Sequence, residues 1–493
     1  MVAIKAIHDW NGEPGVLISW HPSPATLAKV RDAPVSDVPV SYQQDQHIRG
    51  YRNHVAKGTD MARLNIPAWD IQGQCDIRAM THVINSYVRR HDTYHSWFEF
   101  AEDDTIVRRT VRSPKDIKLV PTNHGEATSA QWREHVLDTP DPLTWDCFHF
   151  GIIQRDDHFT FYISVDHVHT DAMFMGLVLV EIHMMYAALV DGLPPLQLPP
   201  AGSYGDYCAR QRDFTAALTL ETPEVQGWVE FFQKNDGTMP RFPLPLGDFS
   251  VPCSGDMMTV RLLDAKQAER FETACMEAGA RFSGGVFACA AVAERELTGI
   301  DTYHIITPTT TRNGPSEFMT TGWFTGLVPM SVPVGSFGET ARAAQAAFDS
   351  GMPLKDVPHD RVFELAEGTD LGLRTPEPGV PMLSYLDAGL PPLSPAVIAQ
   401  WEAMNGKVYS DSRSAYQVGM WVNRTEKETA VTVAFPNNPI ARESVMRYVE
   451  AMKAVYTRVA DGRAAAPRVG AVRHADVTAD HGRRGELIRV LGG

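Results

Sequence analysis

Residues 159–165 alternate between apolar and polar side chains, and a long apolar run follows them. Phe, Phe, Ile and Val occupy every second position of the first segment, which is the period of a strand with one buried face. Residues 173–189 are nearly all apolar and rich in helix formers, with Glu181 and His183 as the main polar interruptions. This run predicts a buried helix. Between the two, residues 166–171 (DHVHTD) place four ionisable groups where a half-buried strand meets a buried helix.

Similar periodicities predict elements along most of the chain. Expected helices lie at residues 41–52, 76–90, 129–137, 205–218, 224–233, 265–278, 282–297 and 442–460. Expected strands lie at residues 65–70, 94–98, 106–111, 148–153, 257–262, 303–307, 327–334, 380–386, 416–422 and 429–435, with one or two short strands in residues 1–40. Strands and helices mix in comparable numbers in the two halves, which predicts an α/β fold with two similar lobes.

Proline-rich segments and a change in composition suggest the domain limits. Residues 193–201 carry four prolines, and residues 236–252 are again rich in proline and glycine. A chain of 493 residues exceeds one ordinary domain. We expect an N-terminal lobe at 1–200 that carries the DHVHTD motif, a connector at 201–255, a C-terminal lobe at 256–461 and a flexible tail at 462–493, where six arginines occur without aromatic residues.

Charge and cysteine usage narrow the functional classes. The net charge of −15, from 45 basic and 60 acidic residues, argues against a general nucleic-acid binder. Six scattered cysteines without a C-x-x-C pair indicate free thiols in a reducing cytosol. The N-terminus lacks the apolar core of a signal peptide, and the longest uncharged apolar helical run, residues 282–293, is shorter than the roughly 18 residues that a membrane span needs. We therefore expect a soluble cytoplasmic protein, with association at a membrane surface left open.

Three kinds of site fit the DHVHTD motif. A histidine with one free ring nitrogen can act as a general base near neutral pH. His167, His169 and Asp171 match the first part of the H-x-H-x-D-H signature of metallo-β-lactamase-type hydrolases. The motif can also be a buried polar cluster whose members satisfy one another. Ala172 stands where the last histidine of the metal signature belongs, and no second His/Asp group with suitable spacing completes a ligand set, so the metal interpretation is the weakest for this motif.

The same residues resemble the H-H-x-x-x-D-G motif of the condensation-domain and chloramphenicol-acetyltransferase-like superfamily. His167 falls on the catalytic second histidine and Asp171 on the aspartate, while Asp166 and Ala172 replace the first histidine and the glycine. Other segments resemble further motifs of the superfamily in the expected order: residues 41–46 (S-x-x-Q), 88–98 (R-H-E-x-L-R-T-x-F), 203–211 (an aromatic-Asp helix), 307–312 (G-R) and 322–334 (G-x-F-x-N-x-x-P). The D-F-G-W-G motif of plant relatives has no clear counterpart, and residues 410–424 occupy its place.

Longer runs such as RRHDTYHSWFEF and TTGWFTGLVPMSVPV are similar to mycobacterial polyketide-synthase-associated (Pap) acyltransferases of the trehalose-acylating type. The resemblance implies two chloramphenicol-acetyltransferase-like lobes of mixed sheets flanked by helices, with the active-site channel between them. It implies an O-acyltransferase without a cofactor, which moves a long-chain fatty or polyketide acyl group from acyl-CoA or a polyketide-synthase carrier domain to a hydroxyl of trehalose or an acyl-trehalose. Peripheral association with the inner face of the plasma membrane or with a lipid transporter is compatible with such a product.

The resemblance also assigns roles. His167 is the expected general base, and Asp171 the orienting carboxylate, with Arg312 as its candidate partner. Asp166 is an orienting group or a solvated one, and His169 a bystander.

Four further residues are candidates for the substrate channel. Trp323 and Phe324 are candidates for its lining, and a hydroxyl of Thr310 or Thr311 is a candidate oxyanion donor. Two alternatives remain: a non-catalytic condensation-like docking module, and a metal-dependent hydrolase that uses the HxHxD residues.

Overall fold

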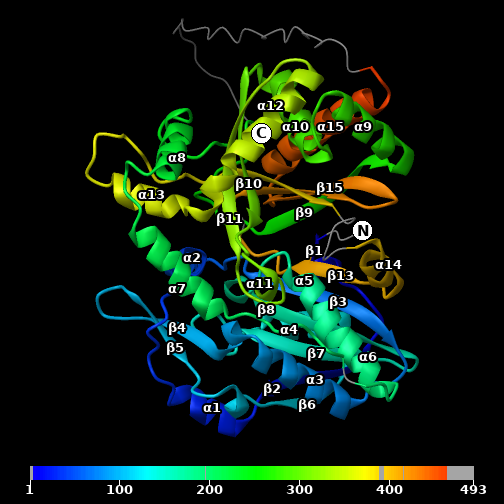
Figure 1. Cartoon of the computed structure of the whole chain (residues 1–493). Helices are drawn as coiled ribbons and strands as arrows, with labels where there is room; N and C mark the ends of the chain where they lie inside the picture. Colours follow the sequence, from blue (N-terminus) through cyan, green and yellow to red (C-terminus); the bar gives the residue numbers. More distant parts are fainter. Residues whose placement is uncertain (1–3, 195, 388–393, 415, 464–493) are drawn as a thin grey trace, which may run out of the picture.

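Two mixed β-sheets, each covered by helices, form the two halves of the molecule (Figure 1). The computed structural model describes residues 4–194, 196–387, 394–414 and 416–463. The first sheet lies in the lower half of Figure 1 and the second in the upper half. The α/β fold class predicted from the sequence is confirmed.

The first sheet has seven strands in the order β1-β13-β3-β8-β7-β2-β6. They are β1 (Ile4–Ala6), β2 (Gly15–Pro22), β3 (Leu64–Gln72), β6 (Leu119–Ala127), β7 (Phe148–Gln154), β8 (His158–Asp166) and β13 (Lys407–Ser410). Only β1 and β13 pair in parallel. The motif-bearing strand β8 is central, between β3 and β7.

Helices cover both faces of this sheet. The elements of the first half are α1 (Pro24–Arg31), α2 (Tyr42–Ala56), α3 (Ile77–Arg90), α4 (Ser129–Leu137), α5 (Phe174–Val178), the π-helical turn η5 (Leu179–Met184), α6 (Met185–Val190) and the hairpin β4 (Ser96–Phe100) and β5 (Ile106–Thr110). The α3 helix and the continuous helix α5–η5–α6 pack on one face against Phe161 and its alternate neighbours. On the other face Trp132 of α4 packs with Tyr162. Strand β8 is therefore buried on both faces, and the expectation of a half-buried strand was wrong because α4 covers the second face.

The second sheet has six strands in the order β11-β10-β12-β14-β15-β9. They are β9 (Gly255–Asp264), β10 (Thr302–Thr310), β11 (Thr325–Pro333), β12 (Pro381–Asp387), β14 (Val418–Arg424) and β15 (Glu428–Pro436). One face packs on α9 (Ala265–Glu277), α10 (Phe282–Thr298), α12 (Phe337–Gly351) and α15 (Pro439–Ala460). The other packs on α8 (Pro223–Gln233) and α13 (His359–Ala366). The remaining helices are α7 (Tyr204–Ala216), α11 (Pro315–Phe318) and α14 (Pro395–Ala403).

The structure confirms the predicted helices and strands to within a few residues at their ends. Several elements were not predicted from the sequence: α1, β6, α11, α12, α13, α14 and β13. Strand β6 is exposed along most of its length, so it carries no alternation of apolar residues. Strand β13 comes from the segment assigned to the C-terminal lobe, yet it pairs with β1 and β3 of the first sheet.

The expected division into lobes stays a prediction, and residues 464–493 of the expected tail lie outside the described residues. All six cysteines are free thiols, as predicted. Within the described parts of the chain, no helix is both long enough and apolar enough to span a membrane.

Candidate active site

His167 lies where β8 ends, in the short 3-10 turn η4 (His167–His169). Its backbone N–H donates to the carbonyl oxygen of Arg63 at 2.7 Å. The imidazole lies against the ring of Trp323, with 4.0 Å between centroids. Its Nδ1 is buried and has no hydrogen-bond partner among the described residues, whereas the residue as a whole is only partly buried. Nε2 is therefore the ring nitrogen that a substrate can meet.

The protonation state of His167 suits a general base. Burial lowers the pKa of His167 to about 4, and the neighbouring ring of His47 acts in the same direction. An ordinary histidine titrates near 6.5. His167 is therefore neutral at physiological pH, with a lone pair able to accept a proton.

Asp166, one residue before His167, is completely buried. Its Oδ1 contacts Nε2 of His47 at 2.7 Å, and its Oδ2 accepts from Nη1 of Arg63 at 2.9 Å. Burial by itself would raise the pKa of the Asp166 carboxyl, but His47, Arg63 and the N–H of Val168 together lower it to about 2. Asp166 is thus an ionised anchor of the His167 turn, and the alternative of a solvated side chain is excluded.

Asp171 joins the motif to the second half of the chain. Two nitrogens of Arg312 donate to its two carboxylate oxygens, at 2.5 and 3.2 Å. Both side chains are almost fully buried. The backbone N–H groups of Met173 and Phe324 also donate to Asp171, each at 3.0 Å. The carboxylate therefore orients both the turn after His167 and the segment that carries Trp323.

His169 faces the protein interior. Its Nδ1 contacts the hydroxyl of Thr93 at 2.9 Å, and its Nε2 contacts Sγ of Cys147 at 3.2 Å. Both ring nitrogens are occupied, and among the described residues the three HxHxD side chains are not gathered at metal-ligand spacing. This geometry does not fit the metal-dependent hydrolase alternative.

The four candidate channel residues have different surroundings. Trp323 is partly exposed above His167, but Phe324 is completely buried and packs beneath the guanidinium of Arg312, 4.3 Å from its ring centroid. The hydroxyl of Thr311 is engaged by the hydroxyl of Tyr207 at 2.9 Å. The hydroxyl of Thr310 accepts from the N–H of Arg312 at 3.2 Å. Trp323 is therefore the one of the four that touches His167 directly.

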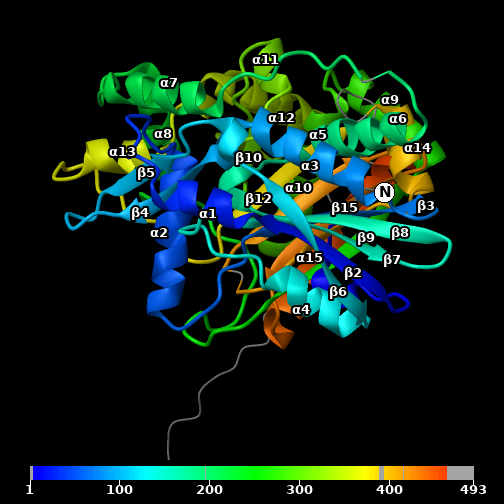
Figure 2. The same ribbon diagram turned by 90° about the horizontal axis from the view of Figure 1, so that it is seen from below.

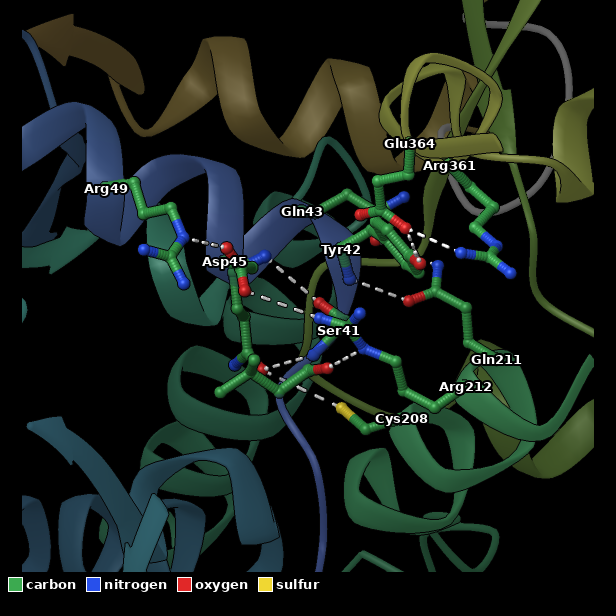
Figure 3. Close-up of polar contacts among 12 residues, drawn as sticks. Ser41, Tyr42, Gln43, Asp45, Arg49, Cys208, Gln211, Arg212, Arg361 and Glu364 are labelled. Atoms are coloured by element: carbon green, nitrogen blue, oxygen red, sulfur yellow. Dashed lines mark hydrogen bonds and ion pairs between the residues drawn. The ribbon is translucent and has the colours of Figure 1, made fainter. Parts of the chain in front are cut away.

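The S-x-x-Q segment bridges the two halves near the motif, and Figure 3 shows its contacts. Ser41 caps α2, and the side chain of Gln43 donates to the carbonyl of Thr325 on β11 at 2.6 Å. Tyr42 donates through its N–H to Gln211 of α7 and through its hydroxyl to Glu364 of α13.

Gln44 donates to the carbonyl of Val168 in the η4 turn at 3.2 Å. The segment therefore supports the motif from the side of α2.

The R-H segment contacts the helix that follows the motif and the segment before Trp323. His91 contacts Glu181 at 2.9 Å, and both are almost completely buried. The other ring nitrogen of His91 accepts from the N–H of Thr321 at 3.2 Å. Glu181, read from the sequence only as a polar interruption of the buried helix, is thus a buried hydrogen-bond acceptor for His91 in the π-helical turn, and it forms an ion pair with Arg90 at 3.1 Å.

Sequence reasoning missed the two residues that hold Asp166. His47 lies inside the predicted helix at 41–52, but nothing in its spacing points to Asp166, 119 residues later. Arg63 stands outside every recognised motif and carries no sequence signal. Its guanidinium also donates to the carbonyls of Thr139 and Pro140.

Comparisons with known proteins show the family to which the chain belongs. A condensation-domain family model matches residues 66–372. The chain is 56% identical over 472 residues to trehalose-2-sulfate acyltransferase PapA2 of Mycobacterium tuberculosis, covering 95% of this chain and 100% of that protein. It is 50% identical over 491 residues to 2'-acyl-2-O-sulfo-trehalose (hydroxy)phthioceranyltransferase PapA1 of the same species, covering 99% and 94%.

Solved structures show the same relationship. A PapA2 acyl transferase structure superposes with a TM-score of 0.90 at 56% identity, covering 93% of this chain and 100% of that chain. The condensation domain of the monacolin K polyketide synthase MokA superposes with a TM-score of 0.64 at 16% identity, covering 87% and 99%, which shows a shared fold. The chain therefore belongs to the Pap acyltransferases of the condensation-domain family.

Proposed function

We propose that this acyltransferase moves a long-chain fatty or polyketide acyl group from a thioester to a hydroxyl of trehalose or of a substituted trehalose. The observation that carries the proposal is the state of His167. Its imidazole is neutral, with Nδ1 buried and Nε2 available to a substrate, and it lies in a turn that Asp166 holds in place. The 56% identity to an enzyme named for trehalose 2-sulfate supports the choice of acceptor. Acyl-CoA and a carrier domain of a polyketide synthase are the donor partners that we propose.

The reaction then runs through the imidazole of His167. Nε2 removes the proton of the sugar hydroxyl as its oxygen attacks the thioester carbonyl carbon. The tetrahedral intermediate collapses with cleavage of the C–S bond, and the protonated imidazole returns the proton to the departing thiolate. No acyl-enzyme and no cofactor enters this sequence, and holding both substrates at His167 supplies part of the acceleration. We place the substrates in a channel between the two halves, next to Trp323.

The test is thiol release from palmitoyl-CoA with trehalose or trehalose 2-sulfate as acceptor, with the product identified by mass spectrometry. We expect acceptor-dependent release by the wild type and by His183→Gln, a matched histidine change on the following helix. We expect His167→Ala to lose at least about 100-fold in kcat/KM. Activity that survives in His167→Ala would exclude the histidine as the base. Inactivity of the wild type with both CoA-bound and carrier-bound acyl groups would favour the docking-module alternative.

We also propose that the enzyme works at the inner face of the plasma membrane, because its acylated product is a lipid. Flotation of the full-length protein with anionic vesicles tests this idea, with a chain truncated after residue 462 as the comparison. If the full-length chain does not float with vesicles, peripheral association is wrong. Equal flotation of both chains would exclude the arginine-rich tail as the membrane contact.

A further inference from the structure

Three histidines from separate elements meet on the face of the first sheet that α4 covers. His21 lies at the end of β2, His124 in β6 and His135 in α4. One possible ligand atom from each lies within 4.8 Å of those of the other two. Figure 2 shows these elements, β2, β6 and α4, side by side. The group is separate from the residues around His167.

A β-bulge brings His124 into the group. In the pairing of β2 with β6, Leu17 lies opposite Gly125 and Ile18 lies opposite Asn123. His124 is therefore the extra residue of the bulged strand, and a bulge re-aims the side chain at its position. The backbone at Gly125 has a φ of 78°, which glycine adopts without strain. Because α4 begins two residues after β6 ends, the helix packs back on the same sheet and places His135 over the face that contains His21.

The cluster contains a nitrogen that the protein itself leaves without a hydrogen-bond partner. Nε2 of His135 is buried and has no hydrogen-bond partner among the described residues. Leaving a buried polar atom unpaired is unfavourable, so an unpaired ring nitrogen on a member of this cluster points to a ligand at this place. The hydroxyl of Ser19 contacts Nε2 of His21 at 2.6 Å and Nε2 of His124 at 2.7 Å. It can donate its one proton to one of these nitrogens and accept from the N–H of the other.

A fourth histidine supports the group from the sheet. His149 on β7 is buried, and its ring centroid lies 5.2 Å from that of His21 and 5.5 Å from that of His135. Nδ1 of His149 is buried and has no hydrogen-bond partner among the described residues.

We propose that His21, His124 and His135 form a binding site for a divalent transition-metal ion, with Zn²⁺ as the best-fitting candidate. Three imidazoles and one open position make a common zinc coordination set. Zinc–nitrogen bonds of about 2.0–2.1 Å place tetrahedral ligands about 3.4 Å apart. The ligand atoms, which lie within 4.8 Å of one another, must therefore approach by up to about 1.4 Å, and His124 is an exposed member of the group. The ion would cross-link β2, β6 and α4 and takes no part in the proposed acyl transfer, so the expectation that this reaction needs no cofactor is unaffected.

The site is connected to the anchor of the catalytic turn. His149 pairs with Ser164 on β8, two residues before Asp166. The hydroxyl of Ser164 accepts from that of Thr139 at 2.8 Å, and the carbonyl of Thr139 accepts from Arg63 at 2.6 Å. Thr139 is the second residue after the end of α4, the helix that carries His135. A metal ion that ties α4 to the sheet would therefore also restrain the loop that holds Arg63 against Asp166.

The test uses untagged full-length protein, stripped with EDTA, dialysed and reloaded with Zn²⁺ at pH 7.5. Zinc content after desalting, competition with a zinc dye, and the melting temperature with and without Zn²⁺ are measured. We compare the wild type with His124→Ala, an exposed position whose change leaves the core intact, and with His183→Gln as a histidine control outside the cluster. Co²⁺ loading adds a spectroscopic readout, because tetrahedral cobalt absorbs strongly in the visible range.

We expect one equivalent of Zn²⁺ and a raised melting temperature in the wild type and in His183→Gln. We expect at least a 100-fold weaker affinity and no thermal shift in His124→Ala. Two results would overturn the proposal: a wild type that retains no Zn²⁺ after reloading, or equal Zn²⁺ affinity of wild type and His124→Ala.

Discussion

The ion pair between Asp171 and Arg312 allows a quantitative test of how the motif is held. We consider Arg312→Met, which keeps an unbranched apolar side chain of similar length and removes the guanidinium. In the wild type this guanidinium donates twice to Asp171 and once each to the carbonyls of Glu317 and Thr320. After the change, the N–H groups of Met173 and Phe324 are the hydrogen-bond donors that remain for the buried carboxylate among the described residues.

Removing one member of a buried pair costs about 3–5 kcal/mol, because the other charge remains buried without its partner. We therefore expect the free energy of unfolding to fall by that amount in Arg312→Met. Asp171→Asn should cost less, about 2–3 kcal/mol, because the guanidinium keeps its two carbonyl acceptors. The double variant loses the interaction only once, so the two changes should couple by about 2 kcal/mol.

Urea unfolding at pH 7.5, followed by circular dichroism and by tryptophan fluorescence, measures these values where the two probes agree. Arg241→Met is the matched control, because Arg241 pairs with Glu377 at the surface, where both side chains are more than half exposed. Surface pairs contribute little, so the control should unfold like the wild type. Additive effects of Arg312→Met and Asp171→Asn, within about 0.5 kcal/mol, would refute the reasoning.

Three further predictions concern groups whose pKa the structure shifts. Because burial lowers the pKa of His167 to about 4, the acid limb of the kcat/KM–pH profile should lie near pH 4; a limb at pH 6.5 would contradict the assignment. Trp323→Ala should hydrate that imidazole and move the limb upward by at least about one pH unit, and an unchanged limb would show that Trp323 does not shield it. Burial raises the pKa of Glu294 to about 7, so its contribution to stability is present below the unfolded pKa of about 4.5 and is lost as the pH rises through 7. Glu294→Gln should therefore raise the free energy of unfolding at pH 8 by about 1–3 kcal/mol relative to the wild type and leave it nearly unchanged at pH 4.5, both measured by urea unfolding.

Local structure and the family could be predicted from the sequence because both depend on neighbouring residues. The alternation at 159–165 predicts β8, and the apolar run after it predicts the continuous helix α5–η5–α6. Residues 129–137 were predicted as the helix that the structure shows as α4. The DHVHTD motif and the ordered segments around it point to the acyltransferase family. Periodicity and motif spacing are properties of short stretches of sequence, and they can be read without knowing which distant residues those stretches contact.

Contacts between distant segments could be decided only by the tertiary structure. His47 and Arg63 reach Asp166 across 119 and 103 residues, because α2 and the start of β3 pack beside the end of β8. Strand β13 joins the first sheet from a segment late in the sequence. Its four residues are too few to show a period, so the sequence did not predict it. The cluster of His21, His124 and His135 depends on a one-residue bulge in β6 and on the packing of α4 against the same face of the sheet. Such contacts depend on how strands register and helices dock, and the free energy of those arrangements is shared among many residues that are not neighbours in the chain.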